Sequence, residues 1–248
     1  MSWNLFATWE GLGLAALAVA AAYVVRGALG FASNLVAVAL LVLWQPLAAV
    51  VPVIILADLC GSIILGAYDF REVRWPELAY LAPALLVGIG LGARLLSAVP
   101  TAHLVPWLGL LVVVYTVWAA FVHTDRLPSL PSWMGAPLGL LAGFLGSVYG
   151  TGGPPIVAYF HLRRLEKRAF RATFQFIGLI FSSVTSALYV HLGLIHLASA
   201  LTALSLVPAV AAGLWLGNRL HFRLNLRSFE YATLALLGVL GLKMMWPW

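Results

Sequence analysis

Long apolar stretches fill almost the whole of this 248-residue sequence, and they restrict its possible folds more than any other feature. Hydrophobic residues make up 63% of the chain and charged residues only 9%. So few polar side chains cannot cover the surface of a water-soluble protein of this size. Soluble enzymes and nucleic-acid-binding proteins are therefore excluded, and no nucleic acid is expected among its partners. We expect an all-α polytopic protein of the cell (inner) membrane, surrounded by the lipid bilayer.

Polar breaks divide the chain into eight apolar segments. A helix needs about 20 apolar residues to cross a bilayer, and six segments have that length. The other two are longer, and small or helix-breaking residues interrupt them near Gly30 and near Gly150. Such interruptions are typical of discontinuous membrane helices. The eight segments are residues 11–45, 47–68, 77–97, 102–122, 132–162, 172–191, 197–220 and 228–246.

The first apolar run could be mistaken for a secretory signal peptide. A signal peptide begins with basic residues, whereas the residues before 11–25 include Glu10 and contain no Lys or Arg. The apolar run also continues beyond any cleavage point. We therefore expect the first residues to belong to the mature chain.

An internal repeat is visible by eye. Residues 81–95 read LAPALLVGIGLGARL and residues 206–220 read LVPAVAAGLWLGNRL, so that eight of the fifteen positions match without a gap. At a similar offset the break near Gly30 aligns with the break near Gly150. We expect one integral membrane domain made of two repeats, residues 1–124 and 125–248. Each repeat would hold one broken or re-entrant segment followed by three transmembrane helices.

Two topologies fit this repeat, and the basic residues help to choose between them. If each broken segment is a re-entrant hairpin, each half crosses three times, and the two halves are inverted. The loops near residues 70, 125, 165 and 223 then share one side and carry 11 of the 14 basic residues. If all eight segments cross fully, the same side carries only 9. Basic residues concentrate in cytoplasmic loops, so we favour the inverted hairpins, with both termini outside.

The broken segments are the first candidates for a binding site. Unwound backbone in a bilayer survives only where it packs in protein or lines a polar cavity. Glycine amides and a helix N-terminus attract anions, and the run Gly150, Thr151, Gly152, Gly153 followed by two prolines offers both. We expect Gly152 to need an unusual backbone conformation and to let the chain approach the ligand. The alternative is that glycines such as Gly27 and Gly146 only allow close helix packing.

The first half adds side chains to this expected anion cradle. Ser33 and Asn34 follow the first break and supply hydrogen-bond donors. Arg26 and Asp58 are charged residues at membrane depth, where charges are costly and are retained for function or pairing. Arg26 could be the counter-charge of an anion, and Asp58 could pair with it or carry a proton. The alternatives are a structural ion pair or an arginine whose side chain extends to the membrane surface. Gln175 is a candidate lining residue, with an interhelical hydrogen bond as the alternative.

Catalytic and metal-binding motifs are absent from the sequence. The six histidines form no HExxH pair, and there is no phosphate-binding loop. We therefore expect no catalytic residues, no metal site, no cofactor and no enzymatic activity. An intramembrane enzyme, or a channel for another small anion, stays as the alternative.

The two breaks also carry a family resemblance. Gly-Phe-Ala-Ser-Asn-Leu-Val at 30–36 and Tyr-Gly-Thr-Gly-Gly-Pro-Pro at 149–155, in a chain of about 250 residues, resemble the sulfite exporter family TauE/SafE. The resemblance implies a secondary transporter, an exporter, of small sulfur-containing oxyanions such as sulfite, sulfoacetate and other organosulfonates. The anion would be held between the two broken helices. The resemblance does not settle export against import, the coupling ion (H⁺ or Na⁺) or whether the chain forms a homo-oligomer.

The topology gives a first testable prediction. Tags fused to the two ends of the chain should both react with a membrane-impermeant label in intact cells, because both termini are expected outside. Two unreactive tags, or one reactive and one unreactive tag, would reject the inverted-hairpin topology.

Overall fold

The computed structural model describes residues 8–30, 32–64, 70–121, 129–221 and 226–246, and every regular element within these ranges is helical. This confirms the all-α expectation. Five helices, α1, α4, α5, α8 and α9, are long and apolar enough to cross a membrane, and α3 and α10 are shorter apolar helices. The elements in chain order are α1 (Trp9–Leu29), α2 (Ser33–Leu41), α3 (Leu47–Ile64), η2 (Phe70–Glu72), α4 (Trp75–Ala98), α5 (Thr101–Phe121), η4 (Ser132–Met134), α6 (Gly135–Tyr149), α7 (Gly153–Leu162), α8 (Lys167–His191), α9 (Leu197–His221) and α10 (Leu226–Met245).

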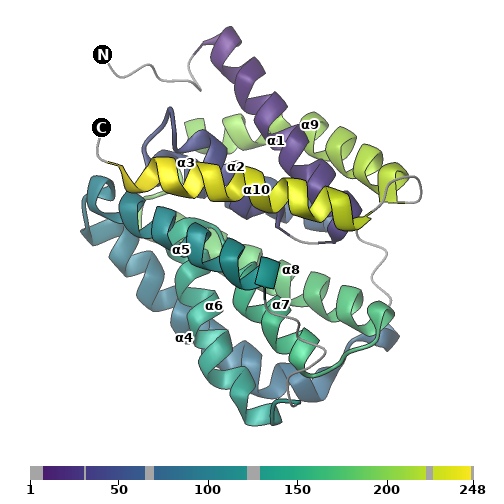
Figure 1. Cartoon of the computed structure of the whole chain (residues 1–248). Coiled ribbons are helices and arrows are strands. Elements are labelled where there is room, and N and C mark those ends of the chain that lie inside the picture. The colour runs from purple at the N-terminus through teal and green to yellow at the C-terminus, as the bar shows by residue number, and fades with distance from the viewer. Residues whose placement is uncertain (1–7, 31, 65–69, 122–128, 222–225, 247–248) are drawn as a thin grey trace.

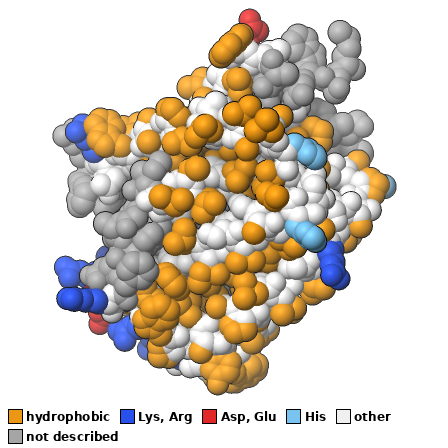
Figure 2. All heavy atoms as spheres, turned by 180° about the vertical axis from the view of Figure 1, so that it is seen from behind, with side chains coloured by type: hydrophobic (Ala, Val, Ile, Leu, Met, Phe, Trp, Pro, Cys, Tyr) orange, Lys and Arg blue, Asp and Glu red, His pale blue; other side chains and the backbone are white. Residues whose placement is uncertain are grey.

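The outer surface of the helical bundle is apolar. Large hydrophobic side chains such as Leu17, Trp107 and Leu201 are more than half exposed. Orange apolar side chains cover much of the face in Figure 2, whereas Lys and Arg side chains lie near its edges. So much exposed apolar area is unfavourable in water, whereas lipid tails are as apolar as these side chains. The surface therefore agrees with a multi-pass membrane protein.

Both interrupted segments are discontinuous helices, as predicted. Helix α1 stops at Gly30, whose φ of 89° is left-handed, and α2 begins three residues later at Ser33. Helix α6 stops at Gly150, with φ of 71°, and α7 begins at Gly153. In both breaks the glycine N–H donates 2.7 Å to the carbonyl oxygen four residues back, at Arg26 and at Gly146. Glycine adopts this capping conformation without steric cost.

The repeated segment makes the same kind of helix–helix contact in both halves. Helix α4 packs along α6, the first helix of the other half, and α9 packs along α1 (Figure 1). A Cβ atom added at Gly88 would collide with the carbonyl oxygen of Leu140 on α6, and one at Gly217 with that of Val24 on α1. The glycines that match in the repeat are therefore close-packing positions.

Further helices also pair across the two halves of the chain. Helix α5 lies beside α10 (Figure 1), and α3 packs against α8. A two-fold relation between the halves would produce these pairings, but the membrane inversion of the repeats stays a prediction. The expected boundary at residues 124 and 125 and both chain ends lie outside the described residues.

Helix lengths do not choose between hairpins and full crossings. Helix α1 has 21 residues, which at about 1.5 Å each is long enough to cross the hydrocarbon core alone. Its counterpart α6 has only 15 residues. The topology of the broken segments therefore also stays a prediction.

The contact between α4 and α6 can be tested with neighbouring glycines on one helix. Gly88→Ala should lower the stability of the purified protein by about 1–3 kcal/mol, because its methyl group has no room against α6. Gly90→Ala is the matched control, since a Cβ there meets nothing within 4 Å. Thermal melting in detergent measures both variants. Equal melting temperatures for the two would contradict the packing role of Gly88.

Candidate functional site

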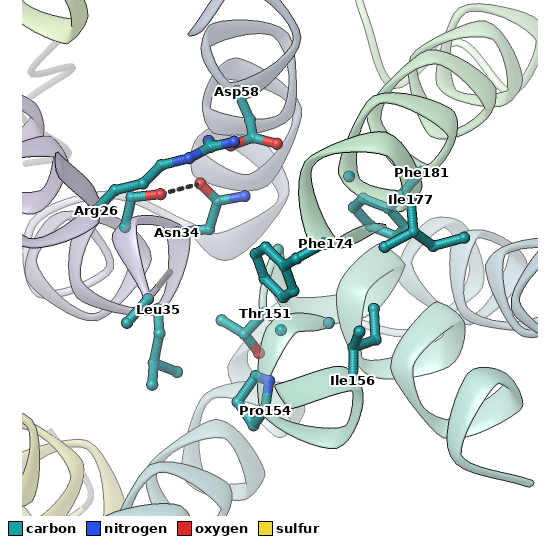
Figure 3. Close-up of a pocket in the computed structure, with 16 residues that line it drawn as sticks. Arg26, Asn34, Leu35, Asp58, Thr151, Pro154, Ile156, Phe174, Ile177 and Phe181 are labelled. Carbon is teal, nitrogen blue, oxygen red and sulfur yellow. Dashed lines mark hydrogen bonds and ion pairs between the residues drawn. The ribbon is translucent and has the colours of Figure 1, made fainter. Parts of the chain in front are cut away.

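A cavity of about 70 Å³ lies where the two helix breaks meet (Figure 3). One buried water needs about 10–15 Å³, so this cavity can hold a few waters or one small ion. Its walls come from α1, α3, α8 and the first turns of α2 and α7. We call it the central cavity. Of the predicted binding residues, it is lined by Arg26, Ser33, Asn34, Asp58, Gly150, Thr151, Gly152 and Gly153. Their role in binding stays a prediction.

A buried ion pair forms one side of the central cavity. The Arg26 guanidinium on α1 pairs with the Asp58 carboxylate on α3, and each residue is only 5% exposed. Asp58 does partner Arg26, as one of the alternatives left open by the sequence expected, whereas a proton-carrying role of Asp58 stays a prediction. The positive charge of Arg26 is therefore already balanced within the protein.

Three polar side chains form hydrogen bonds with this ion pair. Arg26 donates to Ser62 Oγ at 3.2 Å and to Gln175 Oε1 at 2.9 Å. The Ser182 hydroxyl on α8 donates to Asp58 Oδ2 at 2.7 Å. Charge-assisted hydrogen bonds of this kind offset part of the cost of burying two charges. The network joins α1, α3 and α8 beside the first break.

Two helix N-termini line the central cavity. Helix α2 begins at Ser33 and α7 at Gly153, and the first turn of each contributes lining residues. The first N–H groups of a helix have no partner within that helix, and they carry the positive end of its dipole. The Ser33 hydroxyl donates to Asn34 Oδ1 at 3.3 Å, which leaves the Asn34 NH₂ group to donate elsewhere. Both ends therefore present donors rather than acceptors.

Thr151 supplies a further donor at the second break. It is only 2% exposed, and its hydroxyl has no hydrogen-bond partner among the described residues. A buried hydroxyl without a partner costs free energy, so such groups are rare unless something binds them. Thr151 is the lining residue that most directly indicates a ligand.

An apolar wall closes the central cavity opposite its polar groups. Phe174, Ile177 and Phe181 come from α8, and Ile156 comes from α7 (Figure 3). Apolar walls exclude water and lower the local dielectric constant, which strengthens electrostatic interactions inside the cavity. A small charged ligand would therefore interact strongly with the donors on the other side.

Gly152 differs from its predicted role. Its φ of −75° is one that any residue adopts. A Cβ at Gly152 would lie 2.5 Å from the Ala142 carbonyl oxygen on α6, so the missing side chain serves helix packing. The expectation of an unusual conformation was wrong. Gly153 has more room, since its Cβ would meet only the Phe174 ring at 3.6 Å.

The packing alternative fits the two glycines for which the sequence raised it. A Cβ at Gly27 would lie 2.8 Å from the Cα atom of Gly217 on α9. One at Gly146 would lie 2.6 Å from the Phe181 ring. Neither glycine lines the central cavity.

Gln175 is the one predicted binding residue that does not line the central cavity. It reaches the Arg26 guanidinium by its hydrogen bond, but it lines a neighbouring cavity instead. Its predicted contact with a ligand in the central cavity is therefore indirect.

A second polar cluster, around Glu77, was not predicted from the sequence. The Glu77 carboxylate at the start of α4 accepts hydrogen bonds from the Tyr159 hydroxyl at 2.6 Å and from the Arg163 guanidinium at 2.7 Å. Hydrogen bonding to Glu77 raises the pKa of Arg163, which keeps the ion pair charged. The cluster fixes the C-terminal end of α7 to α4. The only signal in the sequence was an acid at the start of an apolar segment, and its partners are more than 80 residues away.

No group of three or more His, Cys, Asp or Glu side chains that could hold a metal occurs within the described ranges. The donor groups around the central cavity come instead from amides, hydroxyls and a guanidinium.

Comparison with known proteins identifies the family. The model of the family described as "Sulfite exporter TauE/SafE" matches residues 14–244. The "Probable inner membrane transporter protein TsaS" of Comamonas testosteroni is 28% identical over 193 residues, which cover 77% of this chain and 80% of that protein. No solved structure matches. Both matches are transporters, which confirms the expectation of a transporter rather than an enzyme. The chain belongs to the sulfite exporter TauE/SafE family of membrane transporters.

Proposed function

We propose that this transporter exports small sulfur-containing oxyanions, such as sulfite or sulfoacetate and other organosulfonates, and holds them in the central cavity between the two broken helices. The observation that carries the proposal is the buried, unpartnered hydroxyl of Thr151 beside two helix N-termini. Each of these groups is a hydrogen-bond donor that lacks an acceptor.

The charge balance of the central cavity favours an anion over a cation. Asp58 is the acidic residue that lines it, and its carboxylate is already paired with Arg26 and bonded to Ser182. A cation would meet a carboxylate that is already paired and two positive helix ends. An anion would meet the Thr151 hydroxyl, the Asn34 amide, the first N–H groups of α2 and the Gly153 N–H of α7, whose next two residues are prolines without an N–H group.

The shape of the donor set favours an oxyanion over a halide. Donors come from two breaks and thus from opposite sides, so a ligand with several acceptor oxygens can use more of them. A sulfite or sulfonate group offers three such oxygens. The choice of sulfur, and of export, rests on the family description, because the printed name of the relative states no substrate.

Transport should depend on gradients alone, because the sequence has no phosphate-binding loop. Purified protein in liposomes should move sulfite or sulfoacetate without nucleotide, and imposed H⁺ or Na⁺ gradients would identify the coupling ion. In a thermal-shift screen, these anions should stabilise the protein, whereas potassium and choline chloride at equal ionic strength should not. Stabilisation by cations or neutral solutes with none by any sulfur oxyanion would reject the proposal, as would an absolute ATP requirement.

The role of Thr151 can be tested with a nearly isosteric substitution. Thr151→Val should weaken the affinity for sulfite or sulfoacetate about tenfold, since a hydrogen bond to a charged group contributes roughly 1.5–3 kcal/mol. The melting temperature without ligand should not fall, because the hydroxyl has no partner to lose. Isothermal titration and thermal melting measure the two effects.

Thr185→Val is the matched control for this experiment. Thr185 is also buried, and its hydroxyl also has no hydrogen-bond partner among the described residues. Unlike Thr151, Thr185 does not line the central cavity. Its substitution should leave the anion affinity unchanged. Equal losses of affinity in both variants would show a general effect of buried hydroxyls and contradict a site at Thr151.

A further inference from the structure

A second cavity of about 270 Å³ adjoins the central cavity, and we call it the vestibule. It lies between α1, α8 and α9. Among the residues that the structure describes, Arg26 alone lines both cavities. The polar side chains that line the vestibule are Arg26, Arg171, Gln175 and Asn218.

The vestibule leads from the protein surface to the buried ion pair. Arg171 and Asn218 are exposed, Gln175 is partly buried and Arg26 is buried. At the inner end, Arg26 bonds to Gln175 on the vestibule side and pairs with Asp58 on the central-cavity side. The Arg26 side chain therefore borders both cavities and is bonded to a lining residue of each.

The vestibule is cationic, in contrast to the central cavity. None of the described residues that line it is acidic. The charge of Arg26 is balanced by Asp58, so the charge of Arg171 remains as the net charge of the vestibule walls. Arg171 forms no ion pair or hydrogen bond with any side chain in the described part of the chain. A guanidinium in this state is a strong donor for the oxygens of an anion.

Two amide side chains add neutral donors near Arg171. Gln175 uses its carbonyl oxygen to accept from Arg26, so its NH₂ group is free to donate. Asn218 lies across from them on α9, and its amide also has no bonded partner among the described residues. One guanidinium and two carboxamides in one cavity can bind a small oxyanion through several hydrogen bonds at once.

We propose that the vestibule is a second anion-binding site, in which Arg171, Gln175 and Asn218 hold the substrate oxyanion before it passes Arg26 into the central cavity. The proposal rests on the proposed function and adds a recognition step to it. Helix α8 begins at Lys167, within the basic stretch 163–171, which the sequence predicts to lie on the cytoplasmic side. The vestibule would therefore load the transporter from the cytoplasm, as export requires.

The electrostatics of the vestibule can be measured without transport. Ala211→Cys in a Cys60→Ala background places the chain's one cysteine in the vestibule and leaves the three proposed binding residues in place. The rates of its reaction with an anionic sulfonatoethyl methanethiosulfonate and a cationic trimethylammonioethyl methanethiosulfonate are then compared. Arg171→Gln should lower the anion-to-cation rate ratio about fivefold or more, because it removes a nearby positive charge.

Arg168→Gln is the matched control for Arg171→Gln. Arg168 is one turn earlier on α8 and exposed, but it does not line the vestibule. Its substitution changes the net charge equally and should leave the rate ratio within about twofold, since exposed charges outside the cavity are screened. An unchanged ratio in Arg171→Gln, or the same fall in both variants, would overturn the proposal.

Protection by ligand separates this proposal from the proposed function. Sulfoacetate should slow modification of the introduced cysteine, and Arg171→Gln should weaken this protection; sulfite itself is unsuitable because it consumes the reagents. In liposomes, Arg171→Gln should raise KM for sulfoacetate from the vestibule side at least about fivefold with little change in kcat. Normal sulfoacetate stabilisation without cysteine protection would reject only the vestibule site. Protection by phosphate but not by any sulfur oxyanion would retain the vestibule and reject the proposed substrate.

Discussion

The ion pair between Arg26 and Asp58 ties the helices around both cavities together. Each charge alone would be costly at membrane depth, and removing one partner of a buried pair typically costs about 3–5 kcal/mol because the other is left uncompensated. Arg26 lies one turn before the end of α1, while Asp58 lies within α3 and receives a hydrogen bond from α8. The pair therefore anchors the last turn of α1 to α3 and α8, just before the glycine at which α1 ends. Arg26 also lines both the central cavity and the vestibule.

The two helix breaks begin with the same glycine cap but continue with different backbone conformations. Unwound chain in a membrane must find partners for its N–H and C=O groups, and both halves begin with a glycine cap of the same geometry. After the cap they differ: Ala32 has a left-handed φ of 73°, whereas Gly152 at the matching position has an ordinary φ of −75°. A left-handed alanine costs roughly 1–2 kcal/mol, and such strain is found where surrounding structure or function requires it. Ala32 lines the central cavity.

The sequence was sufficient to predict features that depend on local chemistry. Glycine and proline clusters located both breaks, because these residues end helices whatever surrounds them. The sequence was not sufficient where a residue's role depends on which helices meet. Gly152 packs on α6 and Gly27 on α9, and neither contact follows from spacing along the chain. The partners of Glu77 escaped notice for the same reason, since only the fold brings them together.

The two cavities differ in charge, and this difference suits a transporter that must both bind its substrate and release it. The vestibule has an uncompensated guanidinium at Arg171, which attracts anions over a distance set by ionic strength. In the central cavity, Asp58 cancels the charge of Arg26, so the anion would rely on hydroxyl and amide donors and on two helix ends. A buried unpaired guanidinium there would hold an oxyanion tightly and slow its release. If the proposed anion binds there, the Asp58 carboxylate would limit the affinity of the central cavity, since an anion that approaches Arg26 would compete with a partner that is already bonded.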